Sequence, residues 1–199
     1  RANLLVVGGY VDESKSSDNE EREQIRRMHD LIAKYDLHDH IRWLEAQVNR
    51  ERNGELYRFV ADHRGAFVQP ALFEAFGLTV IESIATGLPT FATRYGGPLE
   101  LIEHDVSGFH IDPNHGDEAT DRMVTFLDRC AEYPHYWDEV SEGALDRVEA
   151  RYTWRRYADR LLTLSRVYGF WRYVSDLQRD ESRRYLEMFY ALQYRPLAA

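Results

Sequence analysis

The stretch Glu74-Ala-Phe-Gly-Leu-Thr-Val-Ile-Glu82 decides the fold, because it joins a buried strand to a helix through a glycine turn. The segment before it, Gly65-Ala-Phe-Val-Gln-Pro70, is short, apolar and bounded by proline, which is typical of a buried parallel strand. The apolar run after Gly77 predicts a helix with Glu82 about one turn from its start. In an open α/β sheet, the loop that leaves the carboxyl end of a strand faces the ligand crevice. Glu74 is therefore expected beside a binding site, where the N–H groups of the helix start can hold a phosphate.

Strand and helix patterns alternate on both sides of this stretch. Strands are predicted over residues 3–8, 41–44, 65–69, 89–93 and 109–111, and helices over 20–35, 53–63, 78–86 and 99–104. This alternation predicts an α/β fold, with a Rossmann-like parallel sheet, right-handed crossovers and helices on both faces.

The strand patterns stop after Asp117. Helices are predicted over 117–132 and 135–151, and Thr153 is a suitable cap for another helix through about Tyr168. Residues 169–199 are dense in aromatic side chains, which predicts a segment that covers an apolar surface rather than a solvated tail.

Composition excludes several classes of function. A net charge of −9 without a basic stripe argues against a nucleic-acid partner. Cys130 is the only cysteine, so neither an internal disulfide nor a cysteine-based metal cluster can form. No apolar run approaches the roughly 18 residues of a membrane span, and no signal peptide is expected. His38 and His40 flank Asp39, but the histidines lack a metal-ligand spacing, so no metal site is predicted.

Five sequence blocks together resemble the sucrose synthases, which are retaining GT-B glycosyltransferases with a Glu-x7-Glu motif. Besides the segments around Gly65 and Glu74, they are Arg52-Asn-Gly-Glu-Leu-Tyr57, Gly87-Leu-Pro-Thr-Phe-Ala-Thr93, Ser107-Gly-Phe-His-Ile-Asp-Pro113 and Arg184-Tyr-Leu-Glu-Met-Phe-Tyr-Ala-Leu192. The resemblance covers nearly the whole chain. The chain begins within a strand and without Met, so we expect a fragment of a longer polypeptide.

The resemblance implies a division of the chain and an activity. Residues 1–165 are expected to form the nucleotide-sugar-binding, Rossmann-like half of a GT-B fold, and residues 166–199 a helical extension that crosses back to an acceptor domain. The implied reaction is the reversible conversion of sucrose and UDP to UDP-glucose and fructose. The alternatives are another sucrose- or trehalose-forming retaining glycosyltransferase or, for the isolated chain, a non-catalytic nucleotide-sugar-binding module.

The resemblance also assigns the site. Glu74 is expected at the transferred sugar and Glu82 at the ribose hydroxyls. Phe76, Gly77, Leu78 and Thr79 are expected at the sugar and diphosphate, and Gln47 and Asn53 beside the uracil base. No cofactor or metal is implied. The implied partners are UDP-glucose or ADP-glucose with sucrose or fructose, and the implied parent is a cytoplasmic homotetramer without membrane contact.

Each of these residues also has a structural interpretation. Glu82 can belong to a capping box with Thr79, and Glu74 can be a solvated loop residue. Phe76 can be a core side chain beside a tight turn at Gly77. Gln47 and Asn53 can be ordinary polar loop residues, and Gly96-Gly97-Pro98 can be a plain turn or the floor of the sugar site.

Overall fold

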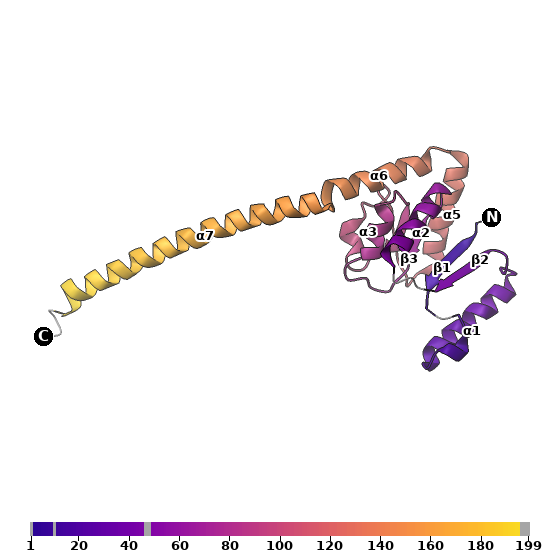
Figure 1. The fold of residues 1–199 in the computed structure, drawn as a ribbon, viewed down its shortest axis with the longest axis horizontal. Helices are drawn as coiled ribbons and strands as arrows, with labels where there is room; N and C mark the ends of the chain where they lie inside the picture. The colour runs from indigo at the N-terminus through magenta and orange to yellow at the C-terminus, as the bar shows by residue number, and fades with distance from the viewer. Residues whose placement is uncertain (1, 10, 46–48, 196–199) are drawn as a thin grey trace. The chain divides into compact units, whose positions relative to one another are not determined.

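The computed structural model describes residues 2–9, 11–45 and 49–195, which form two compact units, residues 1–66 and 67–199 (Figure 1). In the first unit, strands β1 (Leu4–Gly8) and β2 (Ile41–Glu45) pair in parallel, with Val6 opposite Trp43. The short helix η1 (Glu13–Lys15) and helix α1 (Asn19–Lys34) connect them, and helix α2 (Arg50–Asp62) follows β2. Asp18 and Asn49 begin α1 and α2, where each side chain accepts hydrogen bonds from the first-turn N–H groups.

The second unit contains a parallel sheet in the order β3 (Phe67–Gln69), β4 (Thr90–Thr93), β5 (Phe109–Ile111). Helix α3 (Leu78–Ile84) connects β3 to β4, and helix α4 (Pro98–Leu101) connects β4 to β5. Helices α5 (Gly116–Glu132), α6 (Tyr136–Arg151) and α7 (Trp154–Phe189) follow, and α7 continues into the π-helical turn η2 (Tyr190–Tyr194).

All residues of strand β4 are buried, because helices cover both faces of the sheet there. On one face Phe91 stacks on Phe109 of β5 with ring centroids 4.6 Å apart, and Phe126 of α5 lies edge-on to Phe91 at 5.5 Å. On the other face Ala92 belongs to a cluster with Val80 of α3 and with Leu101 and Ile102 around the end of α4. The predicted α/β fold with parallel strands is confirmed, and in the described residues these strands form a separate sheet in each unit.

The end of α4 is tied to α6 by hydrogen bonds to its last carbonyl groups. The Arg147 guanidinium donates to the carbonyl oxygens of Leu101 and Glu100 at 3.1 and 2.8 Å, and the Tyr152 hydroxyl donates to Glu100 at 2.9 Å. These bonds satisfy carbonyls that have no partner within the helix. They fix the position of α4 relative to α6, directly after the loop that follows β4.

Helix α7 is longer than the sequence pattern indicated. Thr153 caps it as predicted, with its hydroxyl accepting from the N–H of Arg156 at 3.3 Å. The helix then continues through Gly169 to Phe189 instead of ending near Tyr168 (Figure 1). It is about 54 Å long at 1.5 Å per residue, and none of its residues is buried. The C-terminal aromatic side chains cover no apolar surface of the described chain, since Trp171 and Tyr185 are each 62% exposed.

Candidate functional site

The candidate site lies at the carboxyl ends of β3 and β4, where two loops are hydrogen-bonded to each other. The loop after β3 carries Glu74, and the loop after β4 carries Tyr95, Gly96 and Gly97. The N–H of Glu74 donates to the carbonyl oxygen of Tyr95 at 3.1 Å, and the N–H of Gly97 donates to that of Glu74 at 2.7 Å. Glu74 and Gly96 form an isolated parallel bridge. The sheet thus extends by one step beyond its strands and fixes the backbone of Glu74.

Glycine is required where these loops meet. A Cβ atom on Gly96 would lie 2.1 Å from the carbonyl oxygen of Glu74, and one on Gly97 would lie 2.6 Å from that of Phe76. Gly96 also has a φ of +98°, a conformation that side chains with a Cβ rarely adopt. The Gly96-Gly97-Pro98 segment is therefore the wall against which the Glu74 loop rests, and more than a plain turn.

The Glu74 carboxylate is held by three hydrogen bonds. Its Oε1 accepts from the N–H groups of Phe76 and Gly77 at 3.1 and 2.9 Å, and its Oε2 accepts from Nε2 of Gln69 at 3.0 Å. The interpretation of Glu74 as a solvated loop residue is wrong, because both oxygens have partners in the chain. A carboxylate offers about four acceptor positions, so these bonds leave about one, on Oε2.

Helix α3 begins directly after this loop. Its N-cap is Gly77, with a φ of +77°, and no side chain caps it. The capping box with Thr79 does not form, because Thr79 is already the second residue of the helix. The N–H groups of Leu78 and Thr79 have no acceptor among the residues that the structure describes. They remain open to an acceptor from outside the chain.

One face of α3 is buried and the other is exposed. Val80, Ser83 and Ile84 are buried, whereas Leu78, Thr79 and Glu82 are exposed. Glu82 lies three residues after Thr79 and four after Leu78, so the three share one side of the helix. The Glu82 carboxylate makes no hydrogen bond or ion pair with the described part of the chain.

Apolar side chains along the Glu74 loop point into solvent rather than into the core. Phe76 is 79% exposed, so its interpretation as a core side chain is wrong. Leu72, Phe73 and Leu78 are exposed by 70%, 68% and 65%. Apolar groups gathered around a few oriented polar groups are typical of a ligand or partner surface. Leu72 and Phe73 were not predicted as site residues, although a cluster of apolar residues in a loop beyond a strand end is a usable signal.

Of the two residues expected beside the base, Asn53 is the one that the structure describes. Asn53 is partly buried in α2, within the first unit, whereas Glu74 and Glu82 belong to the second. Gln47 lies outside the described residues. The roles of both residues therefore stay predictions.

A second buried polar group, missed by the sequence analysis, supports the loop after β4. Asp112, with a side chain 3% exposed, accepts hydrogen bonds from the Tyr95 hydroxyl at 3.0 Å and from the N–H of Asn114 at 3.0 Å. Arg94 and His115 pair with the same carboxylate. Burial alone would raise the pKa of Asp112, but the hydrogen bonds from Asn114, His115 and Tyr95 outweigh it and lower the pKa to about 2. Because this carboxylate stays charged, it anchors Tyr95 beside Glu74.

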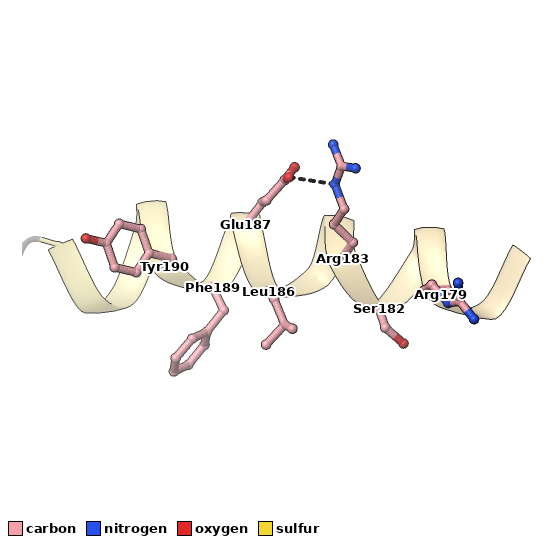
Figure 2. A pocket seen from close by; sticks show the side chains of 7 residues that line it. All are labelled: Arg179, Ser182, Arg183, Leu186, Glu187, Phe189 and Tyr190. Atoms are coloured by element: carbon pink, nitrogen blue, oxygen red, sulfur yellow. Dashed lines mark hydrogen bonds and ion pairs between the residues drawn. The ribbon is translucent and has the colours of Figure 1, made fainter. Parts of the chain in front are cut away.

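The hollows found in the described part of the chain lie away from this site. One hollow of about 750 Å³ lies along α7 between Arg179 and Tyr190, and Figure 2 shows that its lining residues all come from this single stretch of helix. Its polar groups satisfy each other in part, since Arg183 pairs with Glu187 at 3.0 Å. With no second wall it is an open surface, and it does not include Glu74 or Glu82.

Within residues 2–9, 11–45 and 49–195, no group of His, Cys, Asp or Glu is placed to bind a metal ion. No helix in those ranges is long and apolar enough to cross a membrane.

Known proteins confirm the resemblance that the motifs indicate. The chain is 61% identical to sucrose synthase 2 of Pisum sativum over 98% of its own length and 24% of that protein. It is 59% identical to the sucrose synthase of Nitrosomonas europaea over 99% of its length and 25% of that protein. The chain thus spans about a quarter of the length of these relatives.

Solved structures share the fold. Anabaena HepE in complex with UDP matches with a TM-score of 0.63 and 20% identity, over 82% of this chain and 41% of that one. The sucrose-phosphate synthase of Thermosynechococcus elongatus matches with a TM-score of 0.59 and 25% identity, over 84% of this chain and 38% of that one. The sequence profile of the family described as glycosyl transferases group 1 matches residues 1–142. Because this match includes both sheets and the Glu74 loop, the chain belongs to the glycosyl transferases of group 1.

Proposed function

We propose that this chain supplies the nucleotide-sugar side of a retaining glucosyltransferase that interconverts sucrose and UDP with UDP-glucose and fructose. The observation that carries the proposal is the identity of 58–61% to proteins named sucrose synthases, extending over nearly the whole chain. Because the chain spans about a quarter of those proteins, the complete reaction belongs to a longer polypeptide. The fructose site and the basic groups that hold the diphosphate are expected in its other parts.

In this proposal Glu74 acts on the transferred sugar. Its free acceptor position on Oε2 takes a hydrogen bond from a glucosyl hydroxyl. The negative charge stabilises the positive charge that develops at the anomeric carbon as the bond to the leaving oxygen breaks. This carboxylate already accepts three hydrogen bonds from the chain. Electrostatic stabilisation therefore suits Glu74 better than covalent attack on the sugar.

The exposed side of α3 is proposed to hold the nucleotide. The open N–H groups of Leu78 and Thr79 donate to diphosphate oxygens, and Gly77 lets the backbone approach without a Cβ clash. Glu82, which lies on the same side of the helix, accepts from the ribose hydroxyls. Gln47 and Asn53 are proposed to contact the base, and Phe76 to lie against the sugar and diphosphate.

Further properties of the whole protein are proposals of the same kind. We expect it to need no metal or other cofactor, to accept UDP-glucose or ADP-glucose, and to form a tetramer in the cytoplasm. A sucrose-phosphate-forming or trehalose-forming enzyme would share the Glu-x7-Glu core, but the block Arg184 to Leu192 favours a sucrose synthase.

The test is an assay of a full-length protein that carries this chain, supplied with UDP-[13C]glucose and one acceptor at a time. Fructose, fructose 6-phosphate and glucose 6-phosphate separate the alternatives, and NMR of the product reports the anomeric configuration. Sucrose formed from fructose with retained α configuration supports the proposal. Product from a sugar phosphate alone, or an inverted configuration, contradicts it.

A further inference from the structure

Gln69 joins the end of strand β3 to the candidate catalytic carboxylate. It is the last residue of β3, and its side-chain Nε2 donates to Oε2 of Glu74 at 3.0 Å. This orientation of the amide is the only one that fits, because an ionised carboxylate can accept but cannot donate. The carbonyl oxygen Oε1 of Gln69 therefore faces the opposite way. That oxygen is buried and has no hydrogen-bond partner among the described residues.

A buried oxygen without a donor is destabilising. Nearly all buried polar atoms in folded proteins have a hydrogen-bond partner. An unpaired one loses its hydrogen bonds to water and gains no protein donor to replace them. An apolar side chain of similar length, such as methionine, would fill this position without that penalty. The stability of the strand end therefore does not explain a glutamine there, whereas its bond to Glu74 does.

That bond determines where the remaining acceptor position of Glu74 points. Oε1 already accepts from the N–H groups of Phe76 and Gly77, so Oε2 is the oxygen with capacity left. Gln69 holds Oε2 from the side of the sheet. The other loop wall, Tyr95 to Gly97, holds only the backbone of Glu74.

We propose that Gln69 is a positioning residue, which aims Oε2 of Glu74 at the transferred sugar. The inference rests on the proposed function for its consequence in catalysis, although the contact itself does not depend on the reaction. Gln69 itself does not touch the sugar or the nucleotide in this account. Its removal should leave nucleotide affinity unchanged and reduce the steps that need an oriented Glu74.

The test replaces Gln69 by Met in the full-length protein, with Gln24→Met on the exposed side of α1 as the matched control. We expect Gln69→Met to keep or raise the thermal unfolding temperature, because it removes the unpaired oxygen. We also expect kcat to fall roughly ten- to hundredfold, as for a small misplacement of a reacting group. Affinity for UDP should stay unchanged, while the extra affinity of UDP-glucose over UDP should shrink. Gln24→Met should change none of these quantities.

A double-mutant cycle separates positioning from a structural role. In a Glu74→Ala background, Gln69→Met should no longer change the relative affinities of UDP-glucose and UDP, because the carboxylate it orients is absent. A crystal structure of Gln69→Met should show the Glu74 side chain in a different orientation. The proposal is overturned if unfolding temperature and kcat fall together, or if the effect persists without Glu74.

Failure of the proposed function and failure of the role of Gln69 give different results. If the wild-type protein transfers no glucose between sucrose and UDP, the proposed function fails. The role of Gln69 is then decided by the calorimetric and crystallographic results. If the wild-type protein is active and Gln69→Met behaves like Gln24→Met, the proposed function stands and the role of Gln69 is disproved.

Discussion

At the scale of single residues, Glu74 and Glu82 share a motif but lie in different surroundings. Glu74 is partly buried and bound on both oxygens, whereas Glu82 is exposed on α3 with no partner in the described chain. A preoriented group suits a transition state, and a free carboxylate suits a ligand that brings its own donors. The two glutamates should therefore respond differently to removal.

We expect Glu74→Ala in the full-length protein to lower kcat strongly while affinity for UDP changes little. Glu82→Ala should instead weaken UDP binding, by roughly 1.5–3 kcal/mol for a lost charge-assisted hydrogen bond. Calorimetric titration of UDP and steady-state kinetics of both variants measure the two effects. If both variants changed the unfolding temperature but neither kcat nor UDP affinity, both glutamates would have only structural roles.

A second residue-scale prediction concerns acid stability. The pKa of Asp112 is lowered to about 2 in the folded state from its ordinary value of 3.8. Its charge therefore stabilises the fold above pH 4, and this contribution is lost as the pH falls from about 4 to 2. Asp112→Asn should be less stable at pH 7 and should lose less stability over that interval. Unfolding temperatures measured from pH 7 to 2 check this, and parallel curves for the variant and the wild type would contradict it.

At the scale of elements, the sequence predicts the strand ends well and the loops between them poorly. The run Gly65 to Gln69 predicted a strand, so the position of Glu74 beyond a strand end could be predicted. The predicted burial is wrong, because β3 is the edge strand of its sheet and Val68 is 37% exposed. The bond between Tyr95 and Asp112 could not be predicted, because it joins segments 17 residues apart that meet only in the fold. The bond from Gln69 to Glu74 depends on how the loop after β3 turns, which the residue pattern does not indicate. The capping box between Thr79 and Glu82 does not form, because Gly77 is the N-cap of α3 and Thr79 already lies inside the helix.

A helical extension was expected over residues 166–199, but not one continuous helix from Trp154 to Phe189. That continuity runs through Gly169, although glycine disfavours a helix locally. Nothing lies within 4 Å of a Cβ at Gly169, whereas a Cβ at Gly143 in α6 would lie 2.3 Å from the carbonyl oxygen of Val106. The two helix glycines therefore have different roles: close packing requires Gly143, while nothing near Gly169 requires it.

This contrast gives an element-scale prediction. Gly169→Ala should raise the stability or helix content of the isolated chain, by about 1 kcal/mol for a continuous exposed helix. Gly143→Ala should destabilise it by about 1–3 kcal/mol, because α6 must move away from the turn at Val106. Circular dichroism during thermal unfolding compares the two. A Gly169→Ala variant that destabilised the chain would indicate that α7 bends at this residue.

At the scale of the whole molecule, the chain combines two α/β units with a long helix, α7, in which no residue is buried. The exposed aromatic side chains of α7, among them Trp171 and Phe189, form apolar surface that a monomer seldom leaves in water. We predict that residues after Gly169 exchange their amide hydrogens quickly in the isolated chain and slowly in the full-length protein. Slow exchange in a monomeric isolated chain would contradict an extension that packs on another domain.

The central claim is that this chain contributes one side of a sucrose-cleaving site and depends on the rest of a longer protein for the other. Conversion of sucrose and UDP to UDP-glucose, followed in a coupled assay, tests it most directly. We predict turnover by the full-length protein and none by the isolated chain, because the acceptor pocket and its positioning contribution are proposed to lie in the rest of the longer protein. Turnover by the isolated chain near the full-length rate, or none by the full-length protein, would contradict it.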